Sequence, residues 1–218
     1  GEPEVSDADG FPIFYLQWSD ADDGLVFLRS SPEPGQVEFG FIEPGTPAEP
    51  AARDTPFFVS WAPSSDRVLA HVGQRTVQLH DPEAPDAEPT EALAQGDDYS
   101  APAWIDDERA LVIADDALAI LTVDDGRIEP IEPADGPIRF VLSPDRRRVA
   151  FRLLTDRSSG PITAGFDDGA EPAGSTTPVA AATADDGAGL MVIDLETGLR
   201  ETLADESVAA WEWSPDGS

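Results

Sequence analysis

The sequence predicts an all-β fold made of repeated four-stranded units, and three observations lead to this prediction. Short apolar segments that end in a tryptophan or leucine anchor recur along the chain. A polar, turn-like string follows each anchor, and no window shows the 3.6-residue periodicity of an amphipathic helix. The spacings between successive anchors are 43, 43, 38 and 71 residues, and the anchors are Trp18, Trp61, Trp104, Leu142 and Trp213.

The last spacing is long because residues 155–188 form an insertion rich in Gly, Ala, Pro, Ser, Thr and Asp. Without roughly 30 of these residues, the period returns to about 40, which is the length of a four-stranded propeller blade. The insertion falls between the second and third strands of its repeat, so we expect it to project from one rim. A mobile flap and a tolerated low-complexity insertion both fit its composition.

The first strand of each repeat is an apolar segment that ends at the anchor. The most complete following turn is Ser214-Pro215-Asp216-Gly217, in which Ser, Pro and Gly occupy positions that a type I turn prefers. Proline presets φ, and glycine tolerates a positive φ. A hairpin into the second strand is therefore expected.

The second strands are near-continuous apolar runs, which is typical of strands buried on both faces. Their expected ranges are 25–28, 68–72, 110–113 and 149–153. The third strands alternate and often end in Asp, at 76–81, 118–124 and 190–194. Polar fourth strands follow at 127–131 and 200–203, as expected of outer, solvent-facing strands.

This pattern of anchor, Ser-Pro-Asp-Gly, apolar strand and apolar-x-apolar-Asp resembles the WD40-like (PD40) repeat of TolB-type β-propellers. The best copies lie at 213–217, at 143–151 and at 192–198, and the resemblance covers 11–217. Three turns depart from the motif, at 19–24, 62–66 and 105–108. The resemblance implies a β-propeller, often outside the cytoplasm of a prokaryote, but propellers host many unrelated functions.

The repeats predict one propeller domain over 1–218, with blades at 11–54, 55–96, 97–136 and 137–205 and the first strand of a fifth at 206–218. We expect a partial propeller of six to eight blades in the intact ring, because closure protects strand edges. The open edge at 206–218 could then pair with a partner. The alternative is a four-bladed ring closed by 209–213 against the first blade.

Composition excludes several classes of partner. The chain has 44 Asp and Glu against 13 basic residues, all Arg, and a net charge of −31. Such a surface repels nucleic acid and anionic lipid. There is no Cys, and no apolar run reaches the length of a membrane helix. The acidity has two explanations that remain open, adaptation to salt and GC-rich codon usage.

Individual residues suggest few sites. The repeated tryptophans are expected to pack between blades, with Trp211 the best candidate for exposure. His71 and His80 lie on different predicted strands, so structural roles are favoured over a metal site. Asp20, Asp22 and Asp23 resemble the start of a calcium loop, but Ser31 stands where its Glu is expected.

Asp-Asp-Gly recurs at 124–126, 167–169 and 185–187, which favours turns over a dedicated calcium site. We expect no metal and no cofactor. No Gly-x-Ser-x-Gly, Walker A, Gly-x-Gly-x-x-Gly or His-Glu-x-x-His motif is present, so no catalytic residue is assigned. A pair of carboxylates acting as in glycosidases stays open, since that chemistry needs only two.

Three functions remain. The favoured one is a non-catalytic binding or scaffold propeller, extracytoplasmic (periplasmic, cell-surface or secreted), with an unidentified protein or small-molecule ligand. The alternative is the propeller of a prolyl-oligopeptidase-like serine peptidase whose catalytic domain lies outside this chain. The third is a propeller-borne hydrolase that uses carboxylates.

Overall fold

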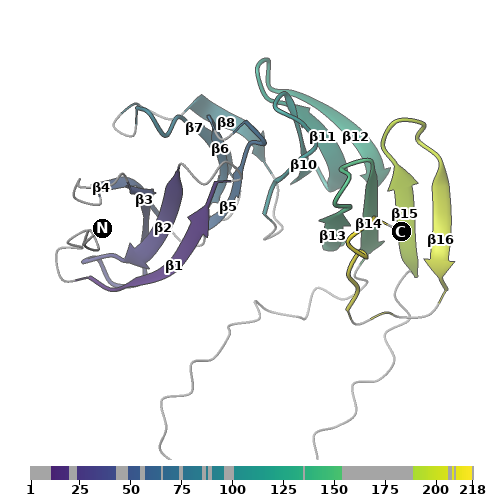
Figure 1. Ribbon diagram of the computed structural model, residues 1–218, viewed down its shortest axis with the longest axis horizontal. Coiled ribbons are helices and arrows are strands. Elements are labelled where there is room, and N and C mark those ends of the chain that lie inside the picture. The colour runs from purple at the N-terminus through teal and green to yellow at the C-terminus, as the bar shows by residue number, and fades with distance from the viewer. Residues whose placement is uncertain are drawn as a thin grey trace, which may run out of the picture.

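The computed structural model describes residues 11–19, 24–42, 49–54, 57–64, 66–73, 76–84, 87, 90–95, 101–134, 136–153, 189–205, 208 and 210–217. Over these residues the protein is all-β, with sixteen strands in four antiparallel four-stranded sheets (Figure 1). The predicted propeller of four-stranded blades is therefore confirmed. None of the described residues belongs to a helix long and apolar enough to cross a membrane.

Each sheet is a meander of four consecutive strands, and neighbouring strands are joined by local connections except β14 and β15, which are separated in sequence by the insertion. The strands of the first two blades are β1 (Ile13–Trp18), β2 (Leu25–Ser30), β3 (Val37–Ile42), β4 (Glu49–Asp54), β5 (Phe57–Trp61), β6 (Val68–Val72), β7 (Thr76–His80) and β8 (Thr90–Gln95). Those of the next two are β9 (Ala103–Trp104), β10 (Arg109–Ala114), β11 (Ala117–Thr122), β12 (Arg127–Pro133), β13 (Ile138–Leu142), β14 (Arg148–Leu153), β15 (Leu190–Asp194) and β16 (Arg200–Ala204).

The core consists of apolar layers between neighbouring blades. In β10, Ala110 and Val112 pack with the second blade, whereas Leu111 and Ile113 pack with the fourth. Side chains alternate across a strand, so a strand between two layers needs apolar residues on both faces. This placement accounts for the continuous apolar runs of the second strands. The outer strands β12 and β16 are mostly exposed, as their polar sequences predict.

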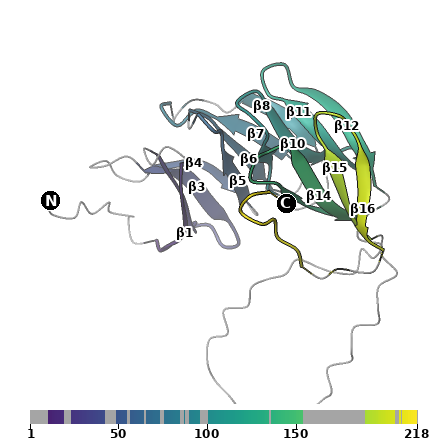
Figure 2. The same cartoon turned by 45° about the vertical axis from the view of Figure 1, so that its right-hand side comes forward.

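The four blades follow one another along an arc, with β1 near one end and β16 near the other (Figures 1 and 2). The sequence predicts the first strand of a fifth blade within 206–218, and the structure has no strand among the described residues of that range. Residues 210–213 form no strand, because no second strand of a fifth blade lies beside them among the described residues.

These residues pack against the fourth blade. Trp211 and Trp213 lie against the cluster of Ala150, Leu190 and Val192. Among the described residues, no strand from 210–213 joins the sheet of the first blade, so the alternative of a four-bladed ring closed in this way is not seen there. The insertion at 155–188 and residues 20–23 lie outside them.

An ion triad around a buried glutamate ties three strands of the first blade together. Arg29 Nε and Arg53 Nε lie 2.6 and 2.7 Å from the two carboxylate oxygens of Glu38. The Glu38 side chain is 1% exposed, so both of its oxygens need these partners. The triad connects β2, β3 and β4, and nothing in the sequence pattern marked it.

Candidate functional site

The anchor tryptophans make the same hydrogen bond at three places in the arc. The indole Nε1–H of Trp61 donates to the Gln17 carbonyl at 3.4 Å, and that of Trp104 donates to the Ser60 carbonyl at 2.9 Å. Trp213 Nε1–H donates to the carbonyl of Val141 at 3.0 Å. Each acceptor directly precedes the anchor of the neighbouring blade. The bond therefore fixes the register between blades, beyond what apolar packing alone specifies.

An arginine completes two of these contacts. The Arg67 guanidinium lies 5.8 Å from the centroid of the Trp104 ring, and Arg148 lies 5.0 Å from that of Trp213. Both distances are in the range of a cation–π interaction. Arg67 also donates to the carbonyl of Asp107, and Arg148 donates to the carbonyl of Gly217. Each arginine thus holds both the anchor and the turn of the following blade.

Trp18 departs from the prediction that all anchors are packed. Its side chain is 60% exposed, whereas Trp61 is 5% and Trp104 is 3% exposed. Leu16, which shares its face by strand alternation, is 54% exposed, and Phe14, where the pairing of β1 with β2 is irregular, is 57% exposed. These side chains are exposed because β1 is the first strand of the arc, and no described blade lies against this face to cover them.

Three carboxylates with lowered pKa values lie at turns on one rim. Burial alone would raise the pKa of Asp106, but its hydrogen bonds with the side chain of Arg109 and the backbone N–H of Glu108 lower it. The Ser143 hydroxyl lowers the pKa of Asp145 through a hydrogen bond of 2.7 Å.

The third such carboxylate is Asp194, whose pKa is lowered by hydrogen bonds from the Thr197 hydroxyl and backbone N–H. Lowered pKa values keep carboxylates ionised, which is the opposite of what a general acid requires. These three carboxylates are therefore turn caps, and the structure brings no two of them together with a third group as a catalytic set.

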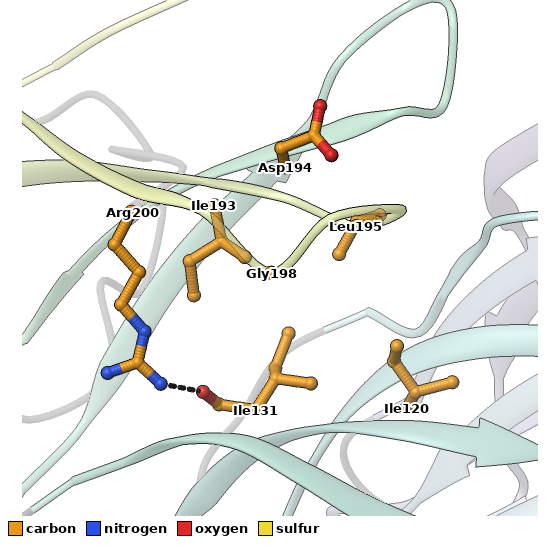
Figure 3. Close-up of a pocket in the computed structure, with 7 residues that line it drawn as sticks. All are labelled: Ile120, Ile131, Ile193, Asp194, Leu195, Gly198 and Arg200. Carbon is orange, nitrogen blue, oxygen red and sulfur yellow. Dashed lines mark hydrogen bonds between the residues drawn. The ribbon is translucent and has the colours of Figure 1, made fainter.

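A hollow of about 110 Å³ lies between the third and fourth blades (Figure 3). It is lined by Ile120, Ile131, Ile193, Asp194, Leu195, Gly198 and Arg200. Arg200 closes one side by donating to the Ile131 carbonyl at 2.7 Å and pairing with Glu132 at 3.0 Å. The Asp194 carboxylate points away from the isoleucines in Figure 3. The hollow is well below the size of a small-molecule pocket, so it is a packing gap between blades.

Both histidines are buried structural residues. His80 lies edge-on to Phe39 with ring centroids 5.0 Å apart, at the contact of the first two blades. Burial lowers the pKa of His80 from 6.5 to about 4, so it is neutral at physiological pH. His71 packs beside Phe58 at 6.2 Å. Among the described residues, no group of three or more His, Asp or Glu could hold a metal ion.

The recurring Asp-Asp-Gly string forms a turn where it is described. Asp124 pairs with Arg67 at 2.8 Å, Asp125 accepts the Arg127 backbone N–H at 3.0 Å, and Gly126 has φ of 67°. Glycine is favoured at such a φ. This copy is structural, as predicted. The copies at 167–169 and 185–187, and the calcium-like residues Asp20, Asp22 and Asp23, lie outside the described residues.

Sequence reasoning missed the arginines of the blade junctions. The sequence does contain a regularity that could have identified them, because Arg67 and Arg148 each follow an anchor by six residues. The indole N–H of Trp211 is buried and its side chain packs against the fourth blade, which agrees with the favoured expectation that the tryptophans pack.

Comparison with solved structures supports the fold. The chain aligns over 100% of its length with the tricorn protease at 18% identity and a TM-score of 0.58, and covers 19% of that chain. It also aligns over 65% of its length with the β-propeller domain of the Trilobed protease from Pyrococcus furiosus, described as having an open velcro topology, at 16% identity and a TM-score of 0.48. That alignment covers 49% of the second chain. No protein-family model matches the sequence, and no curated protein matches it. At 18% identity, the alignment with the tricorn protease is a likeness of fold alone, and it agrees with the propeller blades described above.

Proposed function

We propose that the chain is a non-catalytic β-propeller module of the TolB-like repeat kind, which binds or scaffolds a partner and performs no chemistry itself. One observation carries this proposal. The carboxylates with lowered pKa values, Asp106, Asp145 and Asp194, are all engaged in capping turns. Groups with perturbed pKa values mark active sites when they face a cleft, and these face their own backbone.

The partner that the charge favours is a polypeptide segment rich in Lys or Arg. A net charge of −31 attracts cationic segments over long range and repels nucleic acid and anionic membranes. We place the module outside the cytoplasm, following its resemblance to TolB-type repeats.

A second function is favoured by a specific observation. The full length of the chain aligns with part of the tricorn protease. The chain would then be the propeller of a peptidase, steering polypeptide toward a catalytic domain elsewhere in the same protein. Both functions need a propeller that handles polypeptide without cleaving it, and they differ in whether a hydrolase domain is linked to it.

Hydrolysis and binding assays on the purified chain test the proposal. Fluorogenic peptides, esters and glycosides should show no turnover above a heat-denatured control. Fluorescence anisotropy should show binding of a Lys-rich peptide that weakens with added salt, and no binding of the matched Glu-rich peptide. Turnover that disappears on substituting one carboxylate by its amide would refute the non-catalytic role.

The complete reading frame separates the two functions. A Gly-x-Ser-x-Gly elbow in the same frame, followed by Asp and His of a serine hydrolase, would favour the peptidase propeller. A frame whose remaining repeats are all propeller blades would favour the scaffold. The anisotropy result is independent of this outcome, because both functions predict binding without cleavage by the chain alone.

A further inference from the structure

The hollow between the third and fourth blades is partly open to solvent and is lined mainly by aliphatic side chains. Ile120 and Ile131 come from the third blade, whereas Ile193 and Leu195 come from the fourth. All four strands of both blades are described, so the hollow lies within the arc, between two neighbouring sheets.

A β-bulge in β12 turns Ile131 toward this hollow. The pairing of β12 with β11 shifts at 118–119, and Ile131 is the extra residue at the shift. A bulge re-aims a side chain that strict alternation would place on the opposite face. As a result, the consecutive residues Ile131 and Glu132 both face the fourth blade. Ile131 packs with the apolar cluster between the two blades, and Glu132 pairs with Arg200.

The turn between β15 and β16 lines the hollow with backbone. Gly198 has φ of 70°, where glycine is favoured, and its N–H donates to the Asp194 carbonyl at 2.8 Å. A Cβ added to Gly198 would meet no atom within 4 Å, so open space adjoins the turn.

The size and polarity of the hollow select its occupant. At about 110 Å³ it is below the size of a small-molecule pocket. Apolar cavities of about 150 Å³ bind benzene, so the hollow suits one branched aliphatic side chain. Burial of such a side chain among aliphatic neighbours is favourable, because its apolar surface leaves water.

The positive charge at the hollow is already neutralised. Arg200 pairs with Glu132 at 3.0 Å and donates to the Ile131 carbonyl at 2.7 Å. The Glu132 side chain is 13% exposed, so water shields this pair only in part. An anionic occupant would have to displace Glu132 from Arg200, and a buried carboxylate that loses its partner is costly. This arrangement disfavours a carboxylate or phosphate ligand.

Carboxylates around the hollow favour a cationic partner instead. The hydrogen bonds from Glu196 and Thr197 all reach Oδ1 of Asp194, which leaves Oδ2 able to accept from an ammonium or guanidinium group. The carboxylate of Asp194 points outward from the isoleucines (Figure 3). Glu196 and Glu129 are exposed, and Glu129 is the cross-strand partner of Ile120, so it lies beside the hollow.

We propose that the hollow receives one aliphatic side chain, such as leucine, from an extended polypeptide segment rich in Lys or Arg. This inference rests on the proposed binding of cationic polypeptide and gives that function a site. Residues two apart in an extended chain lie on the same side, about 6–7 Å from each other. Basic residues two positions before and after the leucine can therefore reach Asp194, Glu129 and Glu196 while the leucine is buried.

Fluorescence anisotropy with three labelled peptides tests the proposal on the whole chain. The first peptide alternates Lys and Ser, with leucine in place of its central Lys. The second has alanine in place of the leucine, and the third has Glu in place of every Lys. The leucine peptide should bind on the order of tenfold more tightly than the alanine peptide, because alanine loses most of the buried side chain. The Glu peptide should not bind.

Matched variants locate the site. Ile131→Phe should fill the hollow and remove the preference for leucine. Ile128→Phe makes the same change on the side of β12 that packs with the second blade, and should leave the preference intact. Glu129→Gln should weaken the binding of both Lys peptides by about threefold, whereas Glu33→Gln, at an exposed turn of the first blade, should not. Circular dichroism checks that each variant is folded.

A photoreactive leucine analogue at the central position tests the wild-type chain without any substitution. Its cross-links, mapped by mass spectrometry, should fall within 118–133 or 193–200. Cross-links confined to other segments would overturn the proposal.

The remaining outcomes separate this inference from the function on which it rests. Equal affinity for the leucine and alanine peptides, or an unchanged leucine preference in folded Ile131→Phe, would overturn the site and leave cationic binding standing. Binding of none of the peptides would overturn both the site and the proposed cationic partner.

Discussion

Replacement of Trp104 should destabilise the protein far more than replacement of Trp18, although both residues are anchors of the same repeat. Trp104 is 3% exposed, donates to the Ser60 carbonyl at 2.9 Å and is stacked by Arg67 at 5.8 Å. Trp104→Ala removes a buried indole and leaves a cavity, which costs about 3–5 kcal/mol in proteins. Trp18→Ala removes a side chain that is 60% exposed, and should change the free energy of unfolding by no more than about 0.5 kcal/mol.

Trp104→Phe separates the hydrogen bond from the packing. Phenylalanine keeps most of the apolar ring but cannot donate to the Ser60 carbonyl, and the net loss of one such hydrogen bond costs about 0.5–1.5 kcal/mol. The order of stability should therefore be wild type, then Trp104→Phe, then Trp104→Ala.

Urea unfolding followed by far-UV circular dichroism, in buffer with added KCl, gives the free energies of all three variants and of the wild type. Equal losses for Trp18→Ala and Trp104→Ala would refute the assignment of Trp104 to a blade junction and of Trp18 to an open face. Equal stability of Trp104→Phe and wild type would show that the indole hydrogen bond does not contribute.

Three further predictions concern charge. Burial lowers the pKa of His80 to about 4, so the unfolded chain binds a proton near pH 6.5 that the folded chain takes up only near pH 4. The free energy of unfolding should therefore decrease by up to about 3 kcal/mol as the pH is lowered from 6.5 to 4. In urea unfolding measured at a series of pH values, His80→Phe should make this decrease smaller. Asp145→Asn should lower the thermal midpoint at neutral pH. The difference from wild type should vanish at pH values below the lowered pKa of Asp145, because the wild-type side chain is then also uncharged. A difference that persists at such pH values would contradict the turn-cap role. Added KCl should raise the urea midpoint because it screens repulsion within a chain of net charge −31, and a flat response would count against that repulsion.

The blades could be predicted because their signals are local. Continuous apolar runs such as 68–72 reflect burial on both faces, and β6 spans those same residues. Turn chemistry at 143–148 depends on Ser143 and Asp145, which are close in sequence and bond each other. Propensity and burial agree within each repeat, so its strands follow from the sequence.

The candidate site could be predicted less well, because its contacts join residues far apart in the chain. Arg148 and Trp213 meet across 65 positions, and nothing in either local pattern links them. Trp18 has the same sequence context as Trp61, yet one is exposed and the other is packed. Burial of an anchor depends on the blade beside it, which a repeat pattern alone does not report. The pKa of His80 is likewise lowered by burial, and Phe39 and Phe41, whose rings contact it, come from a different blade.

Hydrogen exchange of the indole N–H groups tests the central claim most directly. ¹⁵N NMR resolves the side-chain signals of the tryptophans in one experiment on the whole chain. The account predicts slow exchange for Trp61, Trp104 and Trp213, whose indoles donate across blade junctions, and fast exchange for Trp18. Slow exchange at Trp18, or fast exchange at Trp104, would contradict an arc of blades that are joined by their anchors and open at β1.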